Sequence, residues 1–311
     1  MGDVDFCKVE SHIKSTFAVG EESESTSFKY IGLEIEKNES GLALSQHAYC
    51  QDISEIVIPC RIAKDMKLTD KEITLLRSLA GQINWAATQS RPDIAFSNCV
   101  VSSGIRHATY DNILTANKTV RAVHAHSVKL CFSKLNMSNG INLIAFSDAS
   151  FANLPDEGSQ GAMLVFMIDC DGRYSLLSWQ SRRIHRVVNS TLSAELLAAV
   201  DAFNTCVYLK AILCDILCSD IKISISILTD NKSITDSIHS TTLAKLENKR
   251  LRVDFALLRD SLKRGELDEI RWVPDDLQIA NCLTKKGASV THLLDVLSGN
   301  LRFDYSSGAF V

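Results

Sequence analysis

The chain has 311 residues, of which 46% are hydrophobic and 23% are charged, and only four are proline. These proportions exclude a disordered or fibrous protein, and the length is sufficient for two compact domains. The formal net charge of −4 gives the chain no overall basic character, so any surface that attracts nucleic acid must be local.

The cysteines and the apolar segments indicate in which cellular compartment the protein is expected. The ten cysteines are scattered and form no Cys-x-x-Cys pair, which argues against a zinc ribbon or a thioredoxin-type site. Buried, reduced thiols are typical of cytoplasmic or nuclear proteins, and the first ten residues lack the apolar run of a secretory signal. Charged residues interrupt the longest apolar stretch, Leu192–Cys218, so we interpret it as a core helix and expect no membrane span.

The first ordered unit is predicted to be a β-hairpin. The runs Phe28–Lys37 and Leu42–Gln46 are rich in apolar residues, and turn-forming residues lie between them. Helical periodicity follows as far as residue 131. Leu75, Leu79 and Ile83 recur every four residues and predict a first helix, which is followed by two more. Turn residues gather at 134–140, which is the expected domain boundary.

Strands alternate with helices after this boundary. The predicted strands cover residues 141–147, 161–169, 173–180, 221–229 and 269–273. Apolar stripes from Leu192 to Val207 and from Leu251 to Leu262 predict helices before the fourth and the fifth strand. The first three strands are expected to be antiparallel and the fourth parallel. The predicted fold class is therefore α/β, with a mixed five-stranded sheet and flanking helices.

Three acidic residues are placed where a ligand site commonly forms. Asp148 is expected just past the first strand of the sheet, Asp230 just past the fourth, and Glu195 early in the long helix, on the edge of its apolar stripe. Carboxylates that share one site repel one another unless a cation neutralises them, and their hard oxygens suit Mg²⁺ or Mn²⁺. The alternative is that they are unrelated surface acids, and spacing alone supports both interpretations equally.

A basic cluster lies between the third strand and the long helix. Arg182, Arg183 and Arg186 adjoin the acidic residues in this part of the sequence and are candidates for contacting a phosphate backbone. The alternative is an exposed basic turn.

Short segments spread over the chain resemble one protein family. Four segments of the second half resemble the ribonuclease H domain of copia-type retrotransposon polyproteins: Ser147-Asp148-Ala149-Ser150-Phe151-Ala152, Ser178-Trp179-Gln180-Ser181, Ser193-Ala194-Glu195 and Thr229-Asp230-Asn231. Four segments of the first half resemble the end of the reverse transcriptase in the same polyproteins: Tyr30-Ile31-Gly32-Leu33-Glu34-Ile35, Leu44-Ser45-Gln46, Leu76-Arg77-Ser78-Leu79-Ala80-Gly81 and Arg91-Pro92-Asp93-Ile94. Many separate motifs in one order rarely arise by chance.

The resemblance implies an organisation for the whole chain. Residues 1–135 would be a reverse transcriptase C-terminal remnant, a hairpin followed by a helical thumb- or connection-like region. Residues 140–290 would form a ribonuclease H-like domain, and residues 291–311 a C-terminal tail. The implied activity is metal-dependent endonucleolytic hydrolysis of the RNA strand of an RNA/DNA hybrid. By this resemblance, two Mg²⁺ or Mn²⁺ ions would be held by Asp148, Glu195, Asp230 and a fourth acid.

Two features of the sequence depart from the family pattern. The pattern has Ala-Asp at its fourth acid, whereas this chain has Ala280-Asn281, and an amide oxygen brings no charge to a metal ion. We interpret the nearby Asp275 and Asp276 as a solvated turn and expect catalysis to be weakened. The Tyr-x-Asp-Asp motif of the polymerase palm is absent, so DNA polymerisation is not expected. The alternatives to an enzyme are an inactive nucleic-acid-binding module and a mobile-element relic.

Overall fold

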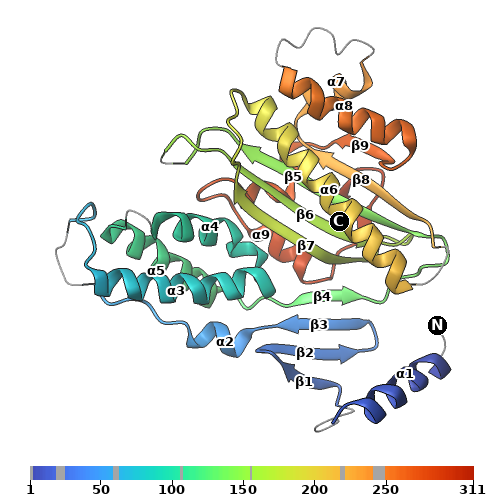
Figure 1. Ribbon diagram of the computed structural model, residues 1–311, viewed down its shortest axis with the longest axis horizontal. Helices are drawn as coiled ribbons and strands as arrows, with labels where there is room; N and C mark the ends of the chain where they lie inside the picture. The colour runs from blue at the N-terminus through green and yellow to red at the C-terminus, as the bar shows by residue number, and fades with distance from the viewer. Residues whose placement is uncertain are drawn as a thin grey trace.

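The computed structural model describes residues 3–18, 25–58, 63–105, 108–154, 156–217, 221–240 and 249–311. Two larger β-sheets organise these residues, a four-stranded sheet in the first half and a five-stranded sheet in the second (Figure 1). A helix, α1 (Asp3–Thr16), precedes the first sheet. The chain passes from the first sheet to the second between β4 (Leu130–Ser133) and β5 (Ile141–Ser150).

The first sheet contains more strands than the predicted hairpin. Its antiparallel order is β1 (Ser27–Tyr30), β2 (Leu33–Asn38), β3 (Gly41–Ser45) and then β4. The sequence predicts one strand over residues 28–37, and this prediction is wrong because Ile31 and Gly32 interrupt it. Both have positive φ, 49° and 77°, which is the conformation of a two-residue hairpin turn. The turn lies within an apolar run, so hydrophobicity alone does not mark it.

The helical part of the first half follows this sheet. It comprises α2 (His47–Asp52), α3 (Asp70–Gln89), η1 (Pro92–Ile94), α4 (Ala95–Gly104) and α5 (Tyr110–Ala125). Arg91, only 2% exposed, joins the end of α3 to the end of α5. Its guanidinium donates to both carboxylate oxygens of Asp93, at 2.8 and 2.7 Å, and to the carbonyl oxygen of Val123 at 2.9 Å. The buried charge is therefore fully paired, as a stable core requires.

The second sheet confirms the predicted α/β fold class, a mixed five-stranded sheet with flanking helices. Its order is β7-β6-β5-β8-β9, in which β5, β6 and β7 are antiparallel, β8 is parallel to β5, and β9 is parallel to β8. The four remaining strands are β6 (Gln160–Ile168), β7 (Tyr174–Arg183), β8 (Ile223–Thr229) and β9 (Glu269–Trp272). The helices α6 (Thr191–Leu217), α7 (Lys232–His239) and α8 (Lys249–Arg264) complete the α/β unit.

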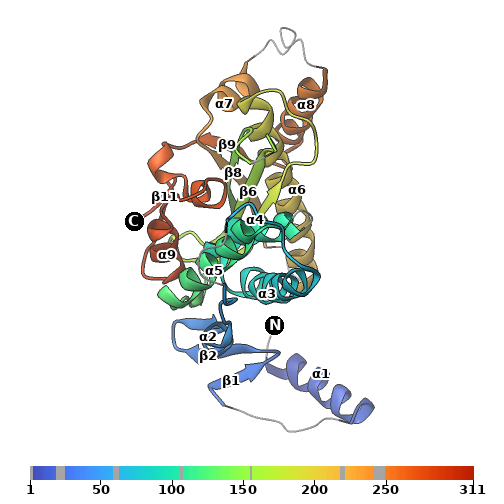
Figure 2. The same cartoon turned by 90° about the vertical axis from the view of Figure 1, so that its left-hand side faces the viewer.

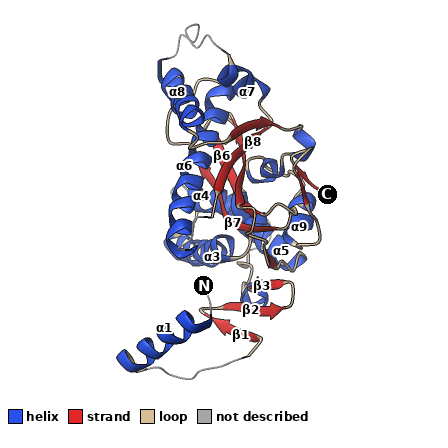
Figure 3. Ribbon diagram, turned by 90° about the vertical axis from the view of Figure 1, so that its right-hand side faces the viewer, coloured by secondary structure: helices blue, strands red, loops and turns tan. Residues whose placement is uncertain are grey.

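Both faces of the sheet are covered. Alternate residues of β5 point to opposite sides: Leu143 and Ala145 pack with α6 and α8, whereas Ile144 and Phe146 pack with the C-terminal elements. Figures 2 and 3 show the sheet between α6 on one side and α9 (Thr291–Leu297) on the other. The central strand is therefore held between two hydrophobic layers.

The C-terminal residues belong to the second of these layers. The sequence predicts a tail over 291–311, whereas in the structure these residues form α9 and a hairpin of β10 (Phe303–Asp304) and β11 (Ala309–Phe310). The Phe310 ring lies 5.8 Å from that of Phe146 and 4.8 Å from that of Phe166, between ring centroids. The sequence shows no strand pattern in this segment because each of the two strands has only two residues.

The two halves of the chain also share this core. Leu130 of β4 and Ala95 of α4 are buried in the same cluster as the C-terminal elements and one face of the sheet. In addition, the indole Nε1 of Trp179 in β7 donates to the carbonyl oxygen of Ala87 at 2.7 Å. The helical region therefore packs directly on the outer strand of the second sheet.

The helix α6 is the one helix of the described residues that is long and apolar enough to cross a membrane. Its 27 residues are apolar on more than one side, but Leu196, Ala199 and Phe203 are buried against the sheet. A helix that packs on a sheet along its length has the same composition. This packing agrees with the interpretation of the segment as a core helix.

Replacement of Phe310 by Ala should destabilise the chain strongly. The side chain is 4% exposed and is surrounded by aromatic rings, so its loss leaves a cavity and should lower the free energy of unfolding by about 3 to 5 kcal/mol. Urea denaturation followed by circular dichroism measures this change. Val311→Ala, at an exposed neighbouring position, is the control and should have little effect. A true tail would respond equally weakly to both substitutions.

Candidate metal centre

The central strand β5 carries the first acid of the site. The sequence places Asp148 just past the strand, and this placement is wrong because β5 continues to Ser150. The strand pairs with β8 only as far as Phe146, whereas its pairing with β6 continues to Ser150 and places Asp148 opposite Ala162. Asp148 therefore lies where β8 has separated from β5 and a space opens between the strand ends.

Glu195 and Asp230 reach the same place from other elements. Ser190 caps the start of α6 by accepting a hydrogen bond from the Ser193 amide at 3.2 Å, and Glu195 follows one turn later. Asp230 follows the last residue of β8. Ligand oxygens of the three acids, Asp148, Glu195 and Asp230, all lie within 4.8 Å of one another. The structure thus brings together the three carboxylates that the sequence selected; we call them the acidic cluster.

Burial and mutual repulsion disfavour the charged forms of these acids. Asp148 is fully buried and Glu195 is 5% exposed. Burial first, and then the charges of Asp148 and Asp230, raise the pKa of Glu195 to about 9. Burial and the charge of Asp148 also raise the pKa of Asp230 to about 6, and burial raises that of Asp148. Without a cation, the cluster holds protons that ordinary carboxylates have lost at neutral pH.

The remaining contacts of the cluster leave one buried oxygen without a partner. The Thr284 hydroxyl donates to Oδ2 of Asp148, and the Ala149 amide donates to Oε2 of Glu195 at 3.1 Å. Oδ1 of Asp148 is buried and accepts no hydrogen bond from the described residues. A buried oxygen of this kind is costly unless it binds something. Three carboxylates, one of which has an unpartnered oxygen, fit a divalent cation such as Mg²⁺ or Mn²⁺.

The fourth position of the expected metal site is held in a hydrogen-bond network. Asn281, in η5 (Ile279–Leu283), donates through Nδ2 to the carbonyl oxygen of Asp275 at 2.9 Å and to Oδ1 of Asp275 at 3.0 Å. Its own Oδ1 accepts from Nζ of Lys285 at 2.6 Å. Both ends of the amide are therefore engaged by neighbouring side chains, and Asn281 offers no charge to the cluster.

A glutamine anchors the loop that carries these residues. Nε2 of Gln278 donates to the carbonyl oxygens of Ser147 at 3.0 Å and Leu228 at 3.3 Å. These two carbonyls lie at the point where β5 and β8 separate, so Gln278 satisfies backbone groups that the sheet itself leaves open. The loop is thereby fixed over the cluster, and Thr284 and Lys285 are placed beside it. The roles of Gln278 and Thr284 depend on contacts with segments distant in sequence, which sequence patterns do not reveal.

The predicted basic cluster does not form an unpaired cationic surface. Nη2 of Arg182 lies 2.6 Å from Oδ2 of Asp201, and Arg186 makes two contacts of 3.0 Å with Asp254. Arg183 is paired with Asp156. The three guanidiniums are partly exposed, and exposed ion pairs of this kind are weak. A phosphate group could displace these carboxylates, so the prediction of a nucleic-acid contact stays a prediction.

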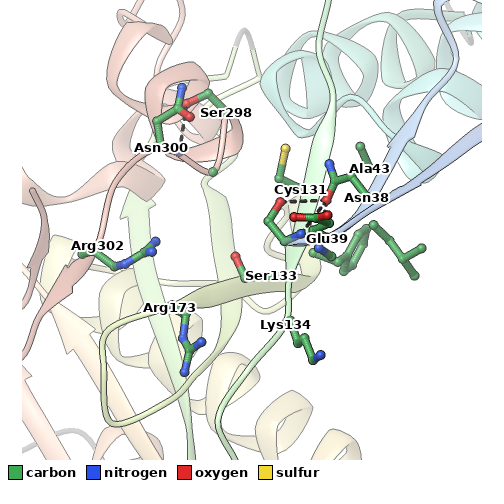
Figure 4. A pocket seen from close by; sticks show the side chains of 15 residues that line it. Asn38, Glu39, Ala43, Cys131, Ser133, Lys134, Arg173, Ser298, Asn300 and Arg302 are labelled. Carbon is green, nitrogen blue, oxygen red and sulfur yellow. Dashed lines mark hydrogen bonds between the residues drawn. The ribbon is translucent and has the colours of Figure 1, made fainter.

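A separate cavity lies at the junction of the two halves. Its volume is 440 Å³, and its lining comes from the β2–β3 turn, from β4 and from residues 298–302. Figure 4 shows Lys134, Arg173 and Arg302 around it. Arg173 is already bound to Asp169 at 2.8 Å and to Asp171 at 2.8 Å. No member of the acidic cluster lines this cavity, so it is distinct from the candidate metal centre.

No family model matches the chain. It is similar to solved ribonuclease H structures. The ribonuclease H1 of the halophilic archaeon Halobacterium salinarum NRC-1 is 17% identical with a TM-score of 0.30, and the match covers 46% of this chain and 94% of that chain. LC11-RNase H1, solved in complex with an RNA/DNA hybrid, is 14% identical with a TM-score of 0.34, covering 46% and 93%.

A longer stretch of the chain is similar to a foamy viral protease-reverse transcriptase, solved in complex with an RNA/DNA hybrid. The identity is 13% and the TM-score 0.46, and the match covers 85% of this chain but 31% of that one. This chain therefore spans less than a third of the foamy viral protein. At these identities and TM-scores, the likenesses say nothing about activity.

The acidic cluster should make the metal-free chain less stable as the pH rises. The pKa of Glu195 is about 9 in the folded chain and returns to its ordinary value of 4.5 on unfolding, so folding favours the protonated form. The stabilisation is fully present below pH 4.5 and is lost as the pH rises towards 9. Denaturation in chelator, from about pH 5 to about pH 9, measures the slope.

Glu195→Gln should flatten this slope, and Glu269→Gln, which removes an exposed carboxylate, should not. Added Mn²⁺ should restore stability at high pH because it binds the deprotonated cluster. A slope that is unchanged by Glu195→Gln would mean that the carboxyl group is not held protonated in the fold.

Proposed function

We propose that the chain is a retrotransposon-derived ribonuclease H-like protein that binds divalent metal and hydrolyses the RNA strand of an RNA/DNA hybrid. The observation that carries this proposal is the acidic cluster, three carboxylates within 4.8 Å of one another, of which Asp148 is fully buried and has an unpartnered oxygen. Such a cluster is difficult to explain as a structural feature, because replacing it with apolar residues would cost less free energy.

A copia-type origin is supported by the sequence motifs and by their places in the fold. Ser147 to Ala152 spans the end of β5, Ser193 to Glu195 the start of α6, and Thr229 to Asn231 the end of β8. These motifs lie at the ends of the elements that form the acidic cluster. We therefore propose residues 1–135 as a reverse transcriptase remnant and residues 140–290 as the ribonuclease H-like domain, acting in the cytoplasm or nucleus.

Each member of the site has a role in this proposal. Asp148, Glu195 and Asp230 would hold Mg²⁺ or Mn²⁺, which when bound supplies an activated water and stabilises the leaving oxygen. The Thr284 hydroxyl and the Ala149 amide fix the orientation of two of these carboxylates. The 2′-hydroxyl group would distinguish the RNA strand from the DNA strand.

Asn281 favours a second candidate function. Its amide is engaged at both ends and brings no negative charge, so metal binding is expected to be weaker than in a site with four acids. If catalysis is lost altogether, the fold would remain as a nucleic-acid-binding module or as a mobile-element relic. Binding and cleavage therefore need separate assays.

Asp148→Asn should abolish cleavage of an RNA/DNA hybrid. The substitution keeps the side-chain volume but removes the most buried charge of the cluster, so the rate in Mg²⁺ or Mn²⁺ should fall by about a hundredfold or more. Gel analysis of a labelled hybrid measures it. Asp260→Asn, on the exposed side of α8, is the control. Equal cleavage by wild type and Asp148→Asn would refute the catalytic proposal, and gel-shift binding without cleavage by either chain would favour the binding module.

Replacement of Arg182, Arg183 and Arg186 by Ala should weaken binding to hybrid or duplex nucleic acid. Each exposed ion pair contributes little to stability, so the fold should be retained. Three fewer cations near the site should lower the affinity at low salt by about tenfold and reduce its salt dependence. Gel shifts at several salt concentrations measure both effects. Arg121→Ala, which also removes an exposed, ion-paired arginine, is the control, and equal affinities would place the contact elsewhere.

A further inference from the structure

We propose that Asp275 supplies the fourth acid of the metal centre in place of Asn281, and that Asn281 is the positioning residue that holds it there. This inference rests on the proposed metal site and changes its composition. The sequence indicated a solvated turn at Asp275, and the side chain is indeed 79% exposed. Its contacts, however, connect it with the acidic cluster.

The sheet brings Asp275 to the cluster. Strands β8 and β9 are parallel neighbours, with Thr229 opposite Trp272, and the amide of Val273 donates to the carbonyl oxygen of Thr229 at 2.9 Å. The two strands end side by side, and Asp230 follows one of them directly. Asp275 begins η4 (Asp275–Leu277) shortly after the other. The carboxyl ends of parallel neighbours are where ligand sites form in α/β sheets.

The charge of Asp275 acts on the other acids, in agreement with its place beside the ends of β8 and β9. Burial is the main cause of the raised pKa of Asp230, and Asp275 raises it further through its charge and a side-chain hydrogen bond. The charge of Asp275 also contributes to the raised pKa of Asp148. Asp275 therefore acts on two members of the cluster although most of its side chain is exposed.

The amide of Asn281 fixes this position. Nδ2 donates both to the backbone oxygen and to Oδ1 of Asp275, at 2.9 and 3.0 Å, which closes a ring that holds the carboxylate in one rotamer. Lys285 completes the arrangement, because its Nζ lies 2.6 Å from Oδ1 of Asn281 and 3.9 Å from Oδ1 of Asp275. A carboxylate at position 281 could not donate these two hydrogen bonds.

The unpartnered oxygen of Asp148 points independently to a bound ligand. It is fully buried and belongs to the acid nearest the centre of the sheet, so a cation bound there would satisfy it. Asp275 would complete the ligand set from the exposed side, where a metal ion enters from solvent. Four carboxylates would then surround the site, three from the cluster and one from the loop.

Metal binding to the full chain tests this assignment without an activity assay. Mn²⁺ affinity is measured by calorimetry or by electron paramagnetic resonance for the wild type, Asp275→Asn and Asp276→Asn. Loss of a charged ligand should lower the affinity of Asp275→Asn by about tenfold or more. Asp276→Asn removes an equal charge from the exposed neighbour and should bind as the wild type does.

A second substitution separates a ligand from a structural residue. Asn281→Asp in the Asp275→Asn background returns an acid to the loop and should restore most of the lost affinity, whereas in the wild-type background it should add little. Equal affinities of Asp275→Asn and Asp276→Asn would overturn the inference, and so would a failure of the double variant to recover binding.

Asp148→Asn distinguishes failure of this inference from failure of the proposed site. If Asp148→Asn loses Mn²⁺ while Asp275→Asn retains it, the three-acid cluster stands and the role of Asp275 is wrong. If the wild type binds no Mn²⁺, or if Asp148→Asn binds as tightly as the wild type, both the site and the inference are wrong. Thermal melting of each variant in chelator checks that the fold is intact.

Discussion

Mutual repulsion of buried carboxylates is the constraint on which the site depends. Charges within 4.8 Å of one another in the protein interior repel each other far more strongly than in water, and burial adds the cost of lost hydration. The fold reduces this cost only in part. The Thr284 hydroxyl, the Ala149 amide and the charge of Lys285 each favour ionised acids, yet the pKa of Glu195 remains at about 9. A divalent cation is the one group that would satisfy all three acids at once.

The scaffold explains how such an unfavourable arrangement is maintained. Strand β5 lies between two hydrophobic layers, one with α6 and the other with α9 and the β10–β11 hairpin. Packing on both faces keeps the strand rigid up to the position where β8 separates from it. Gln278 then binds the carbonyl oxygens that this separation leaves open and fixes the loop above the cluster. The favourable packing of the core therefore offsets the burial and mutual repulsion of the acidic cluster.

Regular periodicity made most of the fold predictable from the sequence. Alternating Ile223, Ile225 and Ile227 marked β8, and the spacing of apolar residues marked the core helices, so the α/β fold class with its mixed sheet followed. The shared site of the three acids was expected from the family resemblance, because their spacing alone left it open. Sequence patterns did not reveal the Ile31–Gly32 turn, which depends on backbone conformation, or the short β10–β11 hairpin, which has too few residues for a period. They also did not reveal the ion pairs of Arg182 and Arg186, because Asp201 and Asp254 are distant in sequence.

The relation of Asp275 to Asn281 was beyond sequence reasoning for a different reason. A sequence motif assigns one residue type to one position. A metal site requires only that enough carboxylates lie close to the ion, whatever their positions in the chain. Carboxylates at both 275 and 281 would place five acids beside one lysine, and the added repulsion would weaken the loop. With Asp275 present, an amide at 281 is the better neighbour, because it donates to the acid and accepts from Lys285 without adding charge. Asn281 in place of the family's fourth acid is therefore compatible with a metal site whose fourth carboxylate belongs to Asp275, six positions earlier in the chain.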